Sequence, residues 1–206
     1  MVAGTNGKTT TNNLIADCLA TSGRPLHCNR EGNNLESGVV TSMLVKPVRV
    51  GAAAESDVPI ATFECDEMYT RFVVPKARPR FFLLLNLFRD QLDRFGEIDH
   101  IQDVVAGALA SSPETAFVYN GDDPLCAGIA ERIGNPKVAF GISSDLGLAA
   151  DRISESRFCQ SCGAQLDYDY IHYGQLGSYR CPQCGWKRPD LRFEAKNVRL
   201  DAGELV

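Results

Sequence analysis

The segment Gly4-Thr5-Asn6-Gly7-Lys8-Thr9-Thr10 combines residue types that bind phosphate. Its glycines let the backbone approach an anion closely, and its N–H groups can point into one concavity. Lys8 would supply positive charge to the β- and γ-phosphates of a nucleotide, and the Thr9 hydroxyl would ligate Mg²⁺. The standard pattern G-x-x-x-x-G-K-[ST] has a glycine where this chain has Val2, so the loop is a shortened variant. A glycine-rich turn before an ordinary helix is the alternative.

Carboxylates follow an apolar segment later in the chain. Residues 59–67 read Pro-Ile-Ala-Thr-Phe-Glu-Cys-Asp-Glu, which predicts a strand that ends in Glu64, Asp66 and Glu67. Three carboxylates within four residues repel one another unless a cation or protons intervene. A carboxylate held at the mouth of a buried strand is well placed to bind Mg²⁺. A merely polar exit from the strand is the alternative.

Cysteines in the last quarter of the chain have the spacing of a metal site. Two C-x₂-C pairs, Cys159 with Cys162 and Cys181 with Cys184, are separated by 18 residues. Two such turns direct four thiolates at one point, and the resulting closed S₄ site has no open coordination position. We therefore predict a structural zinc ion. Redox activity and nucleic-acid docking are the alternatives.

The patterning around these residues predicts an α/β fold with a mainly parallel, doubly wound sheet. We expect strands at residues 24–28, 59–67, 80–87, 116–120, 137–141 and 191–195, and helices at 35–44, 98–110 and 124–133. A further helix follows the phosphate loop, with an apolar face of Leu14, Ile15, Cys18 and Leu19. The tyrosine-rich segment 166–179 is expected to form the hairpin of a zinc ribbon inserted in the sheet domain at residues 155–189.

Composition describes a globular chain of 206 residues, with 44% hydrophobic and 23% charged residues. The net charge of −5 argues against a general nucleic-acid binder, and no apolar run is long enough to span a membrane. Scattered cysteines beside a metal-type quartet favour a reducing, cytoplasmic setting. We expect no signal peptide, because Met1 is followed almost at once by the phosphate loop. Because only three residues precede Gly4, too few for a full core strand, we also expect the chain to be a piece of a longer protein.

The phosphate loop resembles the ATP loop of the Mur ligase family, whose members activate a carboxylate as an acyl phosphate that an amine then displaces. The resemblance implies ATP and Mg²⁺ as cofactors and makes residues 1–206 the central ATP-binding domain. It places the phosphates among Gly4, Thr5, Asn6, Gly7, Lys8, Thr9 and Thr10. It also implies that Glu64 holds Mg²⁺ together with Thr9, and that Lys8 and Glu64 are the catalytic residues.

Two further motifs are similar to those of the family. The pattern Asn-x-x-x-Asp-His-x-Asp-Arg-Tyr/Phe is matched by Asn86, Asp90, Asp93, Arg94 and Phe95. Gln91 stands where many members have a metal-binding histidine, and its carbonyl would be a weak Mg²⁺ ligand. The segment from Asn120 to Pro124 resembles a motif that contacts adenine and ribose, which implies nucleotide contacts for Asn120 and Asp123. Helix capping is the alternative for Asp123.

Within the family, three features resemble the ligase subunit of lipid II isoglutaminyl synthase: the Asn29-Arg30-Glu31-Gly32 segment, the Phe88 to Arg94 segment, and the four-cysteine ribbon. That resemblance implies phosphorylation of the α-carboxylate of D-glutamate in lipid II and amidation to D-isoglutamine. A glutamine amidotransferase partner subunit would supply the ammonia. The protein would be cytoplasmic and would meet lipid II at the inner membrane face.

Two other functions stay open on the sequence. The chain could come from a different Mur or folylpolyglutamate-synthase-type ligase, which would use an amino acid as the nucleophile. It could also be a nucleotide-binding module without ligase activity, in which the ribbon docks a partner.

Overall fold

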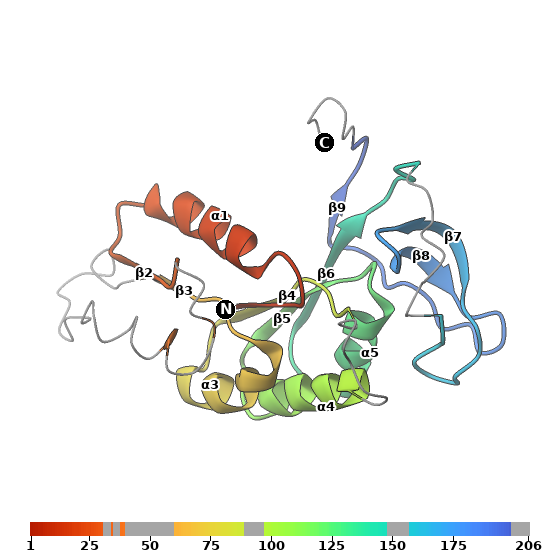
Figure 1. Ribbon diagram of the computed structural model, residues 1–206, viewed down its shortest axis with the longest axis horizontal. Coiled ribbons are helices and arrows are strands. Elements are labelled where there is room, and N and C mark those ends of the chain that lie inside the picture. Colours follow the sequence, from red (N-terminus) through yellow and green to blue (C-terminus); the bar gives the residue numbers. More distant parts are fainter. Residues whose placement is uncertain (31–33, 35–37, 40–59, 89–96, 148–156, 199–206) are drawn as a thin grey trace.

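The computed structural model describes residues 1–30, 34, 38–39, 60–88, 97–147 and 157–198. A five-stranded, wholly parallel sheet lies at its centre, in the order β1-β4-β5-β6-β9 (Figure 1). Its strands are β1 (Val2–Ala3), β4 (Phe81–Leu84), β5 (Ala116–Asn120), β6 (Lys137–Ile142) and β9 (Phe193–Ala195). The α/β fold with a mainly parallel sheet, predicted from the sequence, is confirmed.

A second parallel pair extends this sheet beside β1. Strand β2 (Leu26–Cys28) pairs with β3 (Ile60–Thr62), and the residues after β3 run alongside β1. The Val2 N–H donates to the Phe63 carbonyl at 2.8 Å, and the Cys65 N–H donates to the Val2 carbonyl at 2.8 Å. This pairing sets Glu64 opposite Val2, two residues before the phosphate loop begins.

Helices cover both faces of the sheet, as a doubly wound fold requires (Figure 1). Helix α1 (Lys8–Ala20) lies on one face, where it packs against β1, β2 and β3. On the other face lie α3 (Thr70–Ala77), α4 (Glu97–Ala110) and α5 (Pro124–Arg132), with the short 3₁₀ helix η2 (Glu67–Tyr69) before α3. No helix in the described ranges is long and apolar enough to cross a membrane.

The buried face of α1 differs from the predicted one. Asn12 and Ala16 are the buried positions, whereas Leu14 is 60% exposed and Cys18 is also exposed. A polar residue can occupy the buried face because its amide is paired. The Asn12 Oδ1 accepts from the Thr62 hydroxyl at 2.7 Å. Apolar spacing alone does not reveal such a pair. The prediction that Leu14 and Cys18 belong to the buried face is therefore wrong, and Asn12 and Ala16 take their place.

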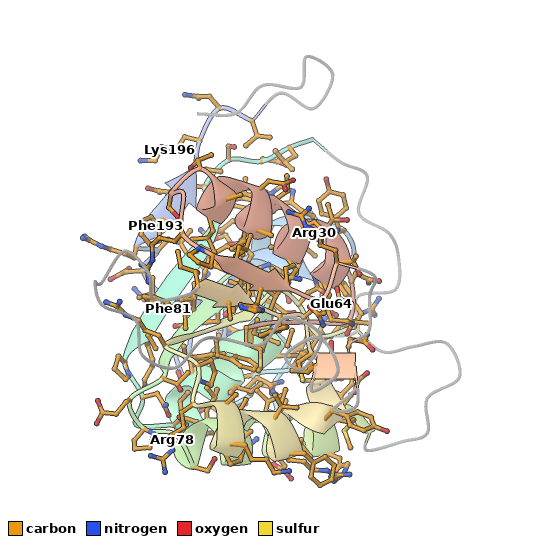
Figure 2. All side chains as sticks on the ribbon, turned by 90° about the vertical axis from the view of Figure 1, so that its left-hand side faces the viewer. Arg30, Glu64, Arg78, Phe81, Phe193 and Lys196 are labelled. Carbon is orange, nitrogen blue, oxygen red and sulfur yellow. The ribbon has the colours of Figure 1, made fainter. Side chains whose placement is uncertain are left out.

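The core lies between the sheet and the helices of the second face. Phe82 and Leu84 of β4 and Phe117 of β5 are fully buried there, together with Leu109 of α4 and Ile129 of α5. Figure 2 shows Glu64 and Arg30 on one side of the molecule and Phe81, at the amino end of β4, on the other. The acidic residue therefore lies at the carboxyl edge of the sheet, where open parallel sheets bind ligands.

A small lobe is inserted between β6 and β9 in the chain, and it lies at the right in Figure 1, beyond β6 and α5. Strands β7 (Asp167–His172) and β8 (Leu176–Arg180) pair in antiparallel register, so the tyrosine-rich segment forms the predicted hairpin. We call residues 157–189 the four-cysteine lobe. Strand β9 then returns to the main sheet beside β6, near the predicted position of a returning strand. The boundaries of a separate ribbon domain, 155–189, stay a prediction.

Candidate functional site

The phosphate loop wraps around the end of β4. A side chain at Gly4, whose φ is 138°, would lie within 3.0–3.2 Å of atoms of Leu85 and Asn86, so only glycine fits this approach. The loop is then fixed to Asn86: the Thr5 N–H donates to its carbonyl at 3.0 Å, and the Asn6 N–H donates to its side-chain oxygen at 2.9 Å. Gly7, with φ 81°, ends the loop at the start of α1. The free N–H groups at this helix start can face an anion.

Lys8 is held over this loop. Its ammonium donates to the carbonyls of Gly4 at 2.6 Å and Thr5 at 3.2 Å, and it lies 3.5 Å from a carboxylate oxygen of Glu67. Burial raises the pKa of the Glu67 carboxyl, and the Lys8 charge opposes part of that rise. The Lys8 ammonium therefore lies next to the loop backbone, between the loop and Glu67. Thr9 and Thr10, the next two residues, are exposed in the first turn of α1.

Glu64 is the carboxylate that the structure leaves unpaired. It is 1% exposed, and neither side-chain oxygen has a hydrogen-bond partner among the described residues. Its backbone is fixed, because Asn29 accepts from its N–H and donates to its carbonyl, both at 2.9 Å. Asn29 thus holds the backbone of Glu64 in place. A buried carboxylate without a partner is costly unless a cation binds it, so this side chain fits a Mg²⁺ ligand.

The neighbouring acids have other roles. Asp66 caps η2, because its carboxylate accepts from the Met68 N–H at 2.9 Å. Glu67 faces Lys8. Of the three carboxylates in this segment, Glu64 is thus the one whose two oxygens are both buried without a hydrogen-bond partner within the part of the chain described. Its assignment as a Mg²⁺ ligand with Thr9 stays a prediction.

Asn120 is the last residue of β5, and Asp123 is the residue just before α5. The Asn120 side-chain oxygen accepts from the Asp122 N–H at 3.0 Å. The Asp123 carboxylate is fully buried, caps α5 by accepting from the Leu125 N–H at 2.9 Å, and accepts from the Leu87 N–H at 2.8 Å. Burial raises its pKa to about 6, and the hydrogen bonds oppose part of the rise. The capping role of Asp123 is confirmed, and nucleotide contacts of Asn120 and Asp123 stay predictions.

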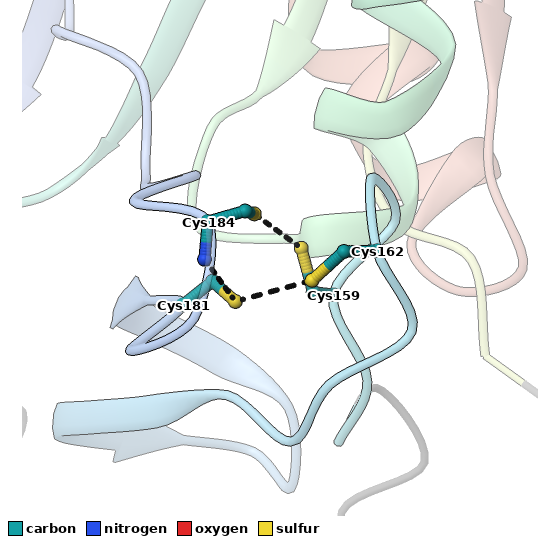
Figure 3. A group of neighbouring side chains, drawn as sticks. All are labelled: Cys159, Cys162, Cys181 and Cys184. Atoms are coloured by element: carbon teal, nitrogen blue, oxygen red, sulfur yellow. Dashed lines mark hydrogen bonds between the residues drawn. The ribbon is translucent and has the colours of Figure 1, made fainter.

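The thiols of Cys159, Cys162, Cys181 and Cys184 converge, and all four sulfur atoms lie within 4.8 Å of one another (Figure 3). The contacts Cys159–Cys184 and Cys162–Cys181 are both 3.5 Å. Backbone N–H groups point at the sulfurs, as in metal-binding knuckles: Ser161 at Cys159 and Cys184 at Cys181, each at 3.4 Å. The Cys184 N–H helps to lower the pKa of the Cys181 thiol, whereas the pKa values of Cys159 and Cys162 are raised by desolvation and by the protons that neighbouring thiols share across the cluster. The cluster fits a structural zinc ion, which stays a prediction.

Comparison with known proteins identifies the family. The sequence matches the Mur ligase middle domain over residues 2–180. The chain belongs to the Mur ligase family. It is 34% identical over 194 residues to the MurT subunit of lipid II isoglutaminyl synthase (glutamine-hydrolyzing) from Staphylococcus aureus strain COL, covering 94% of this chain and 42% of that protein. The MurT subunit from Streptococcus pneumoniae is 34% identical over 195 residues, with the same coverage.

The chain thus spans less than half the length of these curated relatives. Among solved structures, a UDP-N-acetylmuramoyl-L-alanyl-D-glutamate–2,6-diaminopimelate ligase superposes with a TM-score of 0.51 at 17% identity. That match covers 90% of this chain and 37% of the other, and it shows a shared fold.

Some residues of the family motifs lie outside the described ranges. These are Glu31, Gly32, Asp90, Gln91, Asp93, Arg94 and Phe95, and the predicted helix 35–44 falls almost wholly outside them as well. The weak Mg²⁺ contact of Gln91 therefore stays a prediction. Sequence reasoning also missed a residue that the structure brings to the segment after β4, which supports the phosphate loop. Gln175, in the four-cysteine lobe, reaches the end of β4, and no local sequence signal marks that contact.

Proposed function

We propose that this chain is the nucleotide-binding part of an ATP-dependent ligase that joins a carboxylate to an amine in peptidoglycan synthesis. The observation that carries the proposal is the unpaired, buried Glu64 carboxylate next to β1, the strand that leads directly into a lysine-bearing phosphate loop. The N-terminus of a helix and a lysine favour the binding of phosphate groups, and a carboxylate without a hydrogen-bond partner beside them favours the binding of a cation. Membership of the Mur ligase family supports the same chemistry.

Each residue would have a distinct part in phosphoryl transfer. The N–H groups at the start of α1 and the Lys8 ammonium would bind the β- and γ-phosphates and stabilise the charge that grows during transfer, whereas the Thr5 and Asn6 N–H groups are bonded to Asn86. Thr9 and Glu64 would hold Mg²⁺, which supplies neutralising charge between those phosphates when it is bound. Asn120 would bind the nucleoside from the end of β5. The γ-phosphoryl group would pass to the substrate carboxylate, and the amine would displace phosphate from the resulting acyl phosphate.

The likeness to the MurT subunits supports a more specific role. In that role the carboxylate is the α-carboxylate of D-glutamate in lipid II, and the amine is ammonia delivered by a glutamine amidotransferase partner subunit. The product is D-isoglutamine. The work takes place in the cytoplasm at the inner membrane face, and the four-cysteine lobe acts as a structural zinc ribbon.

Dependence of ATP binding on Mg²⁺ tests the nucleotide site. We expect saturable binding of a non-hydrolysable ATP analogue that weakens when EDTA removes Mg²⁺. In Glu64→Gln the affinity with Mg²⁺ should fall roughly tenfold, because a charged ligand of the cation becomes neutral. Isothermal titration with and without Mg²⁺ measures both effects. Glu114→Gln, the same change at an exposed site, is the matched control and should bind like the parent chain. Mg²⁺-independent binding in the parent chain would contradict the proposal.

The choice of nucleophile distinguishes the proposed amidation of D-glutamate from the reactions of other ligases. In the full-length protein with its partner subunit, ammonia, or glutamine as its source, should stimulate phosphate release with lipid II, and amino acids other than glutamine should not. A Mur or folylpolyglutamate-synthase-type enzyme would give the reverse. A nucleotide-binding module without ligase activity would release no phosphate with either nucleophile, and it would instead bind a protein partner in a nucleotide-dependent way.

A further inference from the structure

The four-cysteine lobe is docked on the edge of the sheet that carries the candidate nucleotide site. Strand β8 runs along the turn that follows β5. The Gly177 N–H donates to the Asp122 carbonyl at 2.9 Å, and the Tyr179 hydroxyl donates to the Gly121 carbonyl at 3.2 Å. A buried ion pair joins Arg188 to Asp122 at 2.5 Å. These contacts fix the lobe to the turn between Asn120 and α5.

Gln175 connects the four-cysteine lobe to a segment 88 residues earlier in the chain. It is the last residue of the hairpin turn between β7 and β8 and is 1% exposed. Its side-chain nitrogen donates to the Leu87 carbonyl at 2.7 Å and to a carboxylate oxygen of Asp123 at 3.3 Å. The other Asp123 oxygen accepts from the Leu87 N–H. Gln175, Leu87 and Asp123 therefore form a closed set of hydrogen bonds between the lobe, the end of β4 and the start of α5.

The end of β4 is also the support of the phosphate loop. The Phe88 N–H donates to the Thr5 hydroxyl at 2.9 Å, and Asn86 binds the backbone of Thr5 and Asn6. Leu87 lies between these two contacts. A shift of the Leu87 peptide would move Asn86 and Phe88 with it, and through them the backbone of the phosphate loop at Thr5 and Asn6.

We infer that Gln175 is a positioning residue for the phosphate loop, which it holds in place from the four-cysteine lobe through the Leu87 peptide. The inference rests on the proposed nucleotide-binding function. An amide suits this place because its NH₂ group offers two donors to two acceptors, the Leu87 carbonyl and the Asp123 carboxylate. A leucine at position 175 would leave the Leu87 carbonyl and the Asp123 carboxylate buried without this donor. A carboxylate at position 175 would repel that of Asp123. The four-cysteine lobe thus contributes to the candidate nucleotide site through Gln175 and not through its cysteines.

Gln175→Leu tests the inference in the full-length protein. We expect the affinity for the Mg²⁺–ATP analogue to fall roughly three- to tenfold, the effect of losing about one buried hydrogen bond from the support of the loop. Hydrogen exchange should also become faster at the amides of Thr5, Leu87 and Phe88. Gln175→Asn keeps the amide but is too short to reach, so it should weaken binding in the same direction. It provides a second variant should the leucine variant fold poorly.

Tyr170→Phe is the matched control. The Tyr170 hydroxyl donates to the Ile142 carbonyl at 2.8 Å and accepts from Arg188 at 3.2 Å, so its loss removes two other hydrogen bonds of the same hairpin, neither of which involves Leu87. Tyr170→Phe should lower thermal stability without changing nucleotide affinity or exchange at Leu87. Equal weakening of nucleotide binding by Tyr170→Phe and Gln175→Leu, or unchanged exchange at Leu87 and Phe88 in Gln175→Leu, would overturn the inference. A parent chain that binds no nucleotide would defeat the proposed function instead, and the exchange rates would still decide the positioning role.

Discussion

Lys8→Ala is expected to lower the affinity for Mg²⁺–ATP by roughly a hundredfold. A lysine in this position makes charge-assisted hydrogen bonds to two phosphates, and each such bond is worth about 1.5–3 kcal/mol. The loss of two, at the lower value, gives about 3 kcal/mol, or two orders of magnitude in affinity. Titration of the variant with the non-hydrolysable ATP analogue in the presence of Mg²⁺ measures this loss.

The control for Lys8→Ala must separate lost binding from lost folding. Removing Lys8 leaves the buried Glu67 carboxylate without its ammonium neighbour, which costs stability on its own. In the double variant Lys8→Ala with Glu67→Gln, that unpaired charge is absent, so stability should recover while nucleotide affinity stays low. Lys137→Ala, at an exposed lysine that begins β6, should bind normally. Recovery of nucleotide binding in the double variant would show that Lys8 acts only as a partner of Glu67.

Local signals predicted the parts of the site that consist of neighbours in sequence. Glycines and a lysine within seven residues suffice to indicate the phosphate loop, because its geometry is made by its own backbone. The four-cysteine cluster was predicted for the same reason, since each knuckle is a tight turn of adjacent residues. The sheet followed from the alternation of apolar strands with helices. At this level the described fold agrees with the sequence.

Contacts between distant segments could not be predicted. Asn12 is buried because Thr62 lies opposite it, and the Glu64 backbone is fixed by Asn29, 35 residues earlier. The Gln175–Leu87 contact spans 88 residues. A glutamine in a hairpin turn is an ordinary surface residue until the fold buries it. Such pairs depend on how the elements pack, and spacing along one segment carries no information about them.

Cys181→Ser is expected to unfold the four-cysteine lobe. Structural zinc in small modules contributes about 10–16 kcal/mol of apparent binding free energy, far more than one small hairpin supplies by packing. We expect zinc content to fall from one ion per chain to nearly none, as measured by atomic emission or by a colorimetric chelator. Cys18→Ser, at an exposed cysteine on α1, is the matched control and should keep its zinc.

The fluorescence of Trp186 would report the unfolding of the four-cysteine lobe directly. Trp186 is the single tryptophan of the chain, follows the second knuckle, packs on Tyr179 with ring centres 5.2 Å apart, and donates to Glu131 of α5. Cys181→Ser, or removal of zinc by a strong chelator, should therefore expose the indole and shift its emission to longer wavelength. If zinc is lost and the emission does not move, packing against α5 holds the lobe and the metal is dispensable. In that case nucleotide affinity should also survive metal loss, because Gln175 would stay in contact with Leu87. Unfolding of the lobe should instead weaken nucleotide binding at least as much as Gln175→Leu does.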